Sequence, residues 1–231
     1  MVAGALKKKK NRSFFTAALL GLTVLIISGC AAPALYSIDV KHDAALFAPP
    51  AYVKAEGKAL EAVVAVAEFN DRRKIDDKKI IGRVVEKNGV NILVFPRLVL
   101  PAKTVADGVR DYLKKAAYQV ADKRLQWDLQ EGNIPKGGAK ILVGGSIDEM
   151  EIVCRRGFPA NIYTSGIKLN IVFADVQSGH IVYTRQVEAS ASREHFSFSE
   201  ERMGRELSAL LGEAIRNVFE DKAVAEKIKE L

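Results

Sequence analysis

Short apolar runs in the middle of the chain predict strands. Residues 62–69 are almost wholly apolar and end at two polar residues, which is typical of a buried strand. Two further apolar runs, residues 78–85 and 90–95, flank Asn88-Gly89. Because Asn-Gly fits the tight turn of a β-hairpin, these two runs are expected to pair with each other.

The C-terminal half predicts three longer strands at residues 140–154, 166–176 and 180–190. In the second of these, apolar and polar residues alternate, as expected for a strand with one buried face. Gly144-Gly145 is expected to mark a bulge or bend in the first strand. Gly179 is expected to supply the positive φ of the turn between the last two strands.

Apolar residues three and four positions apart predict two amphipathic helices, at residues 104–120 and 199–220. A short charged helix is expected at residues 222–231 to finish the chain. Each main helix is preceded by a pattern similar to a capping box. The expected pairs are Thr104 with Asp107 and Ser197 with Glu200.

These elements predict an α+β fold, a mixed α/β sandwich with one mostly antiparallel sheet and two main helices packed on one face. We expect this body to span residues 61–231. The preceding residues 30–60 are rich in alanine and proline and predict a tether, with a short strand at residues 35–40.

The N-terminus has a separate pattern. Four lysines at residues 7–10 and Arg12 precede a 14-residue apolar run at residues 14–27. This run is shorter than the roughly 20 apolar residues that a membrane-spanning helix needs. Residues 1–29 are therefore interpreted as a secretory signal peptide, with an uncleaved anchor helix as the alternative.

The sequence Ile27-Ser28-Gly29-Cys30 ends this segment and resembles the bacterial lipobox. The resemblance implies cleavage before Cys30 and attachment of lipid to its thiol and to the new N-terminus. Ala31 follows the cysteine, and in the family pattern the absence of aspartate at this position favours the outer membrane. Several acyl chains would hold the protein stably at the membrane.

The net charge of +7 suggests a nucleic-acid partner. The distribution of the basic residues along the chain argues against this interpretation. Residues 1–29 contain five basic and no acidic residues, so the mature chain keeps 30 basic against 28 acidic side chains. A net charge of +2 does not favour nucleic-acid binding. Two cysteines in the whole chain exclude a disulfide-rich scaffold and a four-cysteine zinc module.

The body also resembles a known group of envelope proteins. The resemblance depends on Asp71-Arg72-Arg73 after the first strand, on the strand pair around Gln177-Ser178-Gly179-His180 and on the C-terminal amphipathic helix. With the lipobox, these features resemble YajG-type outer-membrane lipoproteins. The hairpin is also similar to that of penicillin-binding-protein activator and curli secretion lipoproteins. This group implies an envelope lipoprotein that contacts other envelope components, and no catalytic residue is carried over from it.

Residues with catalytic chemistry are few. His42, His180 and His195 lack the spacing of a zinc site, and solvated turn positions are expected for the histidines beside the turns. Cys154 is expected to be a small buried residue, with an activated nucleophile as the weaker alternative. The sequence also lacks a nucleophile elbow and a phosphate-binding loop. We therefore expect no catalytic residue, no metal and no cofactor.

Two arginine pairs are the candidate binding surface: Arg72 with Arg73, and Arg155 with Arg156. Guanidinium groups recognise carboxylates and phosphates, which peptidoglycan peptides and lipid headgroups carry. Exposed loop charge without a ligand is the alternative. Residues 90–100 are nearly all apolar and are expected to be buried, with an exposed patch for a partner or membrane as the alternative.

The sequence therefore predicts a periplasmic, non-enzymatic binding or assembly module held at the outer membrane by lipid on Cys30. Envelope proteins or peptidoglycan are the expected partners, and no oligomeric state is specified. An accessory factor of peptidoglycan synthesis or of a secretion apparatus is the first alternative. An envelope hydrolase is the second, and it would require Cys154, a histidine and a carboxylate to meet in a cleft.

Overall fold

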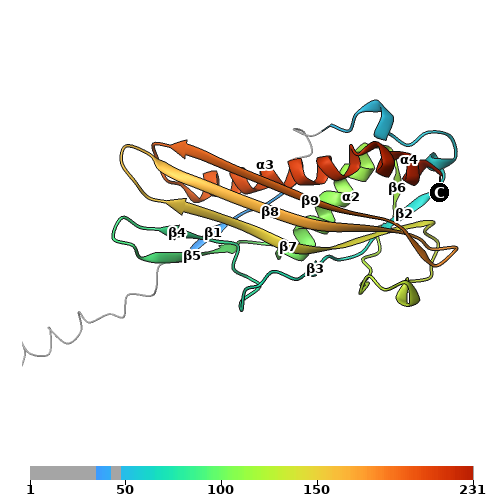
Figure 1. Ribbon diagram of the computed structural model, residues 1–231, viewed down its shortest axis with the longest axis horizontal. Helices are drawn as coiled ribbons and strands as arrows, with labels where there is room; N and C mark the ends of the chain where they lie inside the picture. The colour runs from blue at the N-terminus through green and yellow to red at the C-terminus, as the bar shows by residue number, and fades with distance from the viewer. Residues whose placement is uncertain (1–34, 43–47, 231) are drawn as a thin grey trace, which may run out of the picture. The chain divides into compact units, whose positions relative to one another are not determined.

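The computed structural model describes residues 35–42 and 48–230 (Figure 1). The expected signal peptide and Cys30 lie outside these residues. The strands are β1 (Tyr36–Ile38), β2 (Val63–Val66), β3 (Asn70–Asp71), β4 (Gly82–Val85), β5 (Asn91–Pro96), β6 (Gln119–Val120), β7 (Ile141–Arg155), β8 (Asn161–Asp175) and β9 (His180–His195). The helices are α2 (Pro101–Lys115), α3 (Glu200–Phe219) and α4 (Lys222–Glu230), with single 3₁₀ turns η1 (Ala51–Val53), η2 (Gly57–Leu60) and η3 (Glu131–Asn133).

The nine strands of the described residues belong to one sheet built around β7. On one edge, β7 pairs along its whole length with β8, which pairs in turn with β9. On the other edge, β2, β3 and β4 lie one after another and are all parallel to β7. β5 extends the sheet beyond β4, and β1 adds a parallel edge strand to β5.

The antiparallel pairings of the long strands contain most of the paired residues, while the parallel pairings involve short strands. Figure 1 shows α2 and α3 along the same side of the sheet. The structure confirms the predicted α+β class and the arrangement of two main helices on one face.

Each face of the sheet has its own apolar cluster. Val64 and Val66 of β2 belong to the main core with the buried residues of the helices, whereas Ala65 and Ala67 belong to a smaller cluster around Trp127. Successive residues of a strand point to opposite faces, so the two clusters lie on opposite sides of the sheet. The helices cover one face, and the loop that contains Trp127 covers part of the other.

The predicted hairpin and strands are confirmed. β4 and β5 pair antiparallel across a turn in which Gly89 has a φ of 83°. Gly179 likewise has a φ of 74° in the turn between β8 and β9. Both angles lie in the region that glycine adopts without steric cost.

The predicted start of α2 and the predicted cap of α3 are wrong, whereas α3 begins within one residue of the predicted position 199. α2 begins at Pro101, and Thr104 lies inside the helix, where its hydroxyl donates to the carbonyl of Leu100. Proline suits the first helical position because its missing N–H would have no partner there. α3 is capped by Ser199 rather than by Ser197: the Ser199 hydroxyl accepts from the Arg202 backbone N–H at 3.1 Å.

The end of α2 and the bulge in β7 also differ from the prediction. α2 ends at Lys115, and Ala117 then adopts a φ of 66°, which no helix continues through. The irregularity in β7 lies between Ile147 and Glu149 rather than at the glycines. Gly145 is needed for close packing instead, since a Cβ there would lie 2.3 Å from the Asn170 carbonyl oxygen.

The described part of the expected tether is packed against the body. The predicted short strand is present as β1, and Ile38, Val53 and Ala59 are buried in the main core. The compact unit begins at Leu35 rather than at residue 61. The apolar side chains that this segment contributes to the core explain why it does not remain an extended tether.

Candidate functional site

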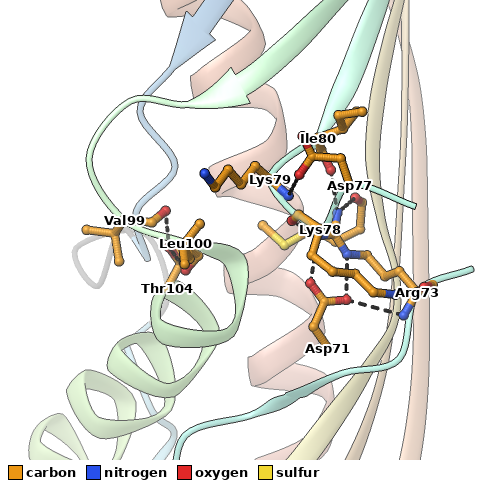
Figure 2. A network of polar contacts seen from close by, with 10 residues as sticks. Asp71, Arg73, Asp77, Lys78, Lys79, Ile80, Val99, Leu100 and Thr104 are labelled. Carbon is orange, nitrogen blue, oxygen red and sulfur yellow. Dashed lines mark hydrogen bonds and ion pairs between the residues drawn. The ribbon is translucent and has the colours of Figure 1, made fainter. Parts of the chain in front are cut away.

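Arg73, one of the expected binding arginines, is a structural residue. Its side chain is only 4% exposed. Figure 2 shows the guanidinium facing Asp71, with which it forms two hydrogen bonds of 2.9 and 2.7 Å. Its remaining donors bind the carbonyl oxygens of Lys78, Ile80 and Met150. A guanidinium has five N–H donors, so Arg73 has none left for a ligand.

The other three arginines do not form one surface with Arg73. Arg72 lies beside Ile147, whose carbonyl accepts from its backbone N–H, whereas Arg155 and Arg156 stand at the end of β7. Arg155 is the eighth residue after Ile147 along β7, which puts the two places about 26 Å apart. Arg156 is further occupied by Glu86 at 3.4 Å and by the ring of Phe198. Arg72 and Arg155 are exposed.

Residues 90–100 are more exposed than expected. Val94 is fully buried, but the side chains of Val90, Leu93, Leu98 and Leu100 are between 38% and 73% exposed. β5 lies near the edge of the sheet and uses only one of its faces for the core. The alternative interpretation, an exposed apolar patch, therefore describes this stretch better than burial does.

A cleft of about 670 Å³ lies where residues 38–42 run along the first half of α3. We call it the α3 cleft. Gly204 permits the close approach, since a Cβ there would lie 2.5 Å from the Asp39 carbonyl oxygen. The Ser208 hydroxyl fixes the same segment by accepting from the backbone N–H of Lys41 at 3.0 Å.

Charged side chains of both signs line the α3 cleft. Arg97 connects its walls through ion pairs with Asp39 at 3.3 Å and Glu200 at 3.2 Å. Arg193 pairs with Glu206 at 3.1 Å. The other charged lining residues are Lys41, Glu201 and Arg205. A ligand that carries both ammonium and carboxylate groups would find partners for each in this cleft.

A hydrogen-bonded histidine lies beside the cleft. His195 Nε2 is 3.0 Å from Glu206 Oε1, and its Nδ1 is 2.6 Å from a guanidinium nitrogen of Arg202. Because a guanidinium can only donate, Nδ1 accepts and Nε2 donates to the carboxylate. Both ring nitrogens are therefore occupied within the protein.

Cys154 does not have the environment of a nucleophile. It is fully buried, and burial raises the pKa of its thiol. Its neighbour Tyr163 has its pKa raised to about 12, first by burial, and the Tyr163 ring packs edge-on against His195. The structure thus brings cysteine, histidine and carboxylate into one region. However, the buried thiol and the occupied imidazole do not form a nucleophile and base.

The remaining chemical candidates are structural or exposed. His180 is 70% exposed and lies 3.6 Å from Glu131, as expected for a turn residue. In residues 35–42 and 48–230, no group of three or more histidine, cysteine or acidic side chains is placed to hold a metal ion. Across that same part of the chain, no helix has the length and apolar character needed to span a membrane.

The α3 cleft was not found from the sequence. Its acidic and basic residues at positions 200–206 have the spacing of an ordinary solvated helix face. The opposing wall comes from residues 38–42, more than 150 positions earlier, in a segment expected to be a tether. No local pattern signals that these segments meet.

Comparisons with known proteins give distant structural matches. No family model and no curated protein matches the chain. A DUF330-family protein from Xanthomonas campestris is 14% identical over 85% of this chain and 96% of its own, with a TM-score of 0.49. A dodecameric PelC variant from Paraburkholderia phytofirmans is 13% identical over 76% and 94%, with a TM-score of 0.41. The LpoB C-terminal domain from Salmonella enterica is 13% identical over 63% and 97%, with a TM-score of 0.31. The resemblance to YajG-type proteins stays a prediction, and function is inferred from the residues of this chain.

Proposed function

We propose that this protein is a lipid-anchored, non-enzymatic binding or assembly module of the bacterial cell envelope. The observation that carries the proposal is the α3 cleft, an open cavity with walls of both charges beside a histidine whose nitrogens are both occupied. Such a cleft can hold a charged ligand, but it offers no activated nucleophile. The lipobox-like sequence before Cys30 supports the lipid anchor, and Ala31 after it supports placement at the outer membrane, facing the periplasm.

The expected ligand is an envelope protein segment or a peptidoglycan peptide. Both carry carboxylates, which match the guanidinium groups of Arg97 and Arg205, and both can carry ammonium groups, which match the carboxylates of Glu200 and Glu201. Ion pairs of this kind give orientation and selectivity more than affinity. An accessory role in peptidoglycan synthesis or in a secretion apparatus would use the same cleft.

The anchor is tested by replacing Cys30 with alanine and separating the membranes of the producing cells. We expect the wild-type protein in the outer-membrane fraction and the Cys30→Ala variant outside it. If the variant remains in the outer membrane, lipid on Cys30 is not the anchor.

The binding role is tested by crosslinking in the intact envelope. A photoreactive residue replaces Ala209, which lines the α3 cleft, and in a control it replaces Leu60, which is exposed elsewhere. We expect a discrete protein or peptidoglycan adduct only from position 209. Arg205→Glu should abolish that adduct, whereas Arg124→Glu, a similarly exposed arginine outside the cleft, should not. Recovery of lipid alone from position 209 would contradict the binding role.

A further inference from the structure

We propose that one end of the sheet is a second membrane contact, which rests on the lipid surface that holds the Cys30 anchor. This inference depends on the lipid anchor of the proposed function. The surface, here called the exposed end, consists of Leu35, Val90, Phe158, Ile162 and Phe196. We infer that the exposed apolar side chains of this region contact lipid rather than a protein partner.

The exposed end is where several strands finish. The β4–β5 turn, the β7–β8 turn and the end of β9 lie together at the left of Figure 1. Phe158 is 92% exposed in the β7–β8 turn, and Phe196 is 85% exposed just after β9. Single exposed apolar residues are common on protein surfaces. A group of large, highly exposed apolar side chains at one place instead indicates an interaction surface.

The two phenylalanines are held by a shared residue. Asn161 is 5% exposed and joins the two segments that carry them. Its side-chain oxygen accepts from the backbone N–H of Gly157, and its side-chain nitrogen donates to the carbonyls of His195 and Phe196. The segments are therefore positioned by buried hydrogen bonds, so the exposure of the rings is a feature of the folded state.

The chain enters the folded unit at this same end. β1 runs parallel to β5, so its first residue lies toward the β4–β5 turn. The ring of Tyr36 packs against Phe198 at 5.0 Å between centroids, two residues after Phe196. Leu35 precedes Tyr36 and is itself 58% exposed.

Chain length then limits the distance from the membrane. Leu35 is the fifth residue after Cys30, and whatever path the chain takes between them, these five steps span at most about 18 Å. Acyl chains on Cys30 would therefore keep the exposed end within reach of the lipid headgroups. The exposed end thus combines Leu35, the described residue nearest to Cys30 in the chain, with the exposed side chains of Phe158 and Phe196.

The charges around the exposed end are compatible with this contact. Lys87 and Arg155 are exposed there, and Glu194 is an exposed acid near the end of β9. Phenylalanine and leucine flanked by basic side chains are the composition of segments that lie in the membrane interface. Basic side chains additionally favour anionic headgroups.

The test uses full-length protein processed in cells and reconstituted in vesicles of phosphatidylethanolamine and phosphatidylglycerol with brominated acyl chains. Phe158→Trp and Phe196→Trp place a fluorophore at the exposed end. Leu60→Trp is the matched control, because Leu60 is exposed and lies near the first residue of β7. The parent protein gives the emission of the buried Trp127 alone. The length of β7 puts the two places about 45 Å apart. Mass spectrometry of the N-terminus records the lipid on Cys30 in the same samples.

We expect lipid on Cys30 in every sample. Bromine should reduce the emission of Phe158→Trp and Phe196→Trp, and should leave that of Leu60→Trp and of the parent unchanged. If Cys30 carries lipid but the two variants lose no more emission than Leu60→Trp, the membrane contact is refuted and the anchor stands. If Cys30 carries no lipid, the anchor of the proposed function is refuted, and the membrane contact that depends on it is refuted as well.

Discussion

Replacing Arg73 by methionine should strongly destabilise the fold. The substitution keeps much of the side-chain volume but removes every hydrogen bond of the guanidinium. Asp71, 14% exposed, would lose its cation, and the buried carbonyl of Met150 would lose its donor. Breaking a buried ion pair by removing one partner costs about 3–5 kcal/mol, because the other charge remains buried without compensation.

The assay is urea denaturation followed by circular dichroism, with Arg72→Met as the matched control. Arg72 is adjacent and exposed, so its substitution should change the free energy of unfolding by less than about 0.5 kcal/mol. In an Asp71→Asn background, Arg73→Met should cost at least about 1 kcal/mol less than in the wild type, since no carboxylate is then left unpaired.

A loss below about 1 kcal/mol for Arg73→Met, similar to that of Arg72→Met, would refute this reasoning. It would mean that the hydrogen bonds of Arg73 contribute little to the fold. Arg73 would then again be a candidate for binding an external carboxylate or phosphate.

Three further outcomes are expected. Gly145→Ala should lower the melting temperature, because its Cβ would clash with the Asn170 carbonyl, whereas Gly132→Ala, with open space around it, should not. Cys154 should react with a thiol reagent at pH 8 only after urea unfolding, since burial both shields the thiol and raises its pKa. Burial raises the pKa of Tyr163 to about 12, against about 10 in an unfolded chain, so its contribution to stability is complete below pH 10 and is lost between pH 10 and 12. Alkaline denaturation of Tyr163→Phe should accordingly show a smaller loss of stability over that interval than the wild type.

Elements defined by local patterns could be predicted from the sequence. The β4–β5 hairpin follows from Asn88-Gly89 between two apolar runs, and the long C-terminal strands follow from their alternation. The start of α2 and the capping residue of α3 could not be predicted, because more than one nearby residue could begin or cap each helix. Ser197 and Ser199 both precede the apolar stripe of α3 and could each cap it. In the folded backbone it is Ser199 whose hydroxyl accepts from the Arg202 N–H and caps the helix.

The role of Arg73 could not be predicted because it depends on contacts that are distant in sequence. The carbonyl of Met150 that binds its guanidinium is 77 residues away. An isolated Asp71-Arg72-Arg73 sequence resembles an exposed basic loop, and only the pairing of β3 with β7 turns one of its arginines inward. The α3 cleft has the same origin, since its walls come from opposite ends of the chain.

The position of β7 has a consequence for the order of folding. β2, β3 and β4 precede β7 by about 70 residues, and all three need its edge as a partner. Pairings between distant segments form slowly, because a long loop must close first. The β7–β8–β9 meander has only short turns to close, so pulsed hydrogen exchange should show its amides protected before those of β2. If the chain crosses a membrane N-terminus first, β2, β3 and β4 emerge before β7, the strand with which they pair. Until residues 141–195 have crossed, these strands would remain unpaired and accessible to chaperones.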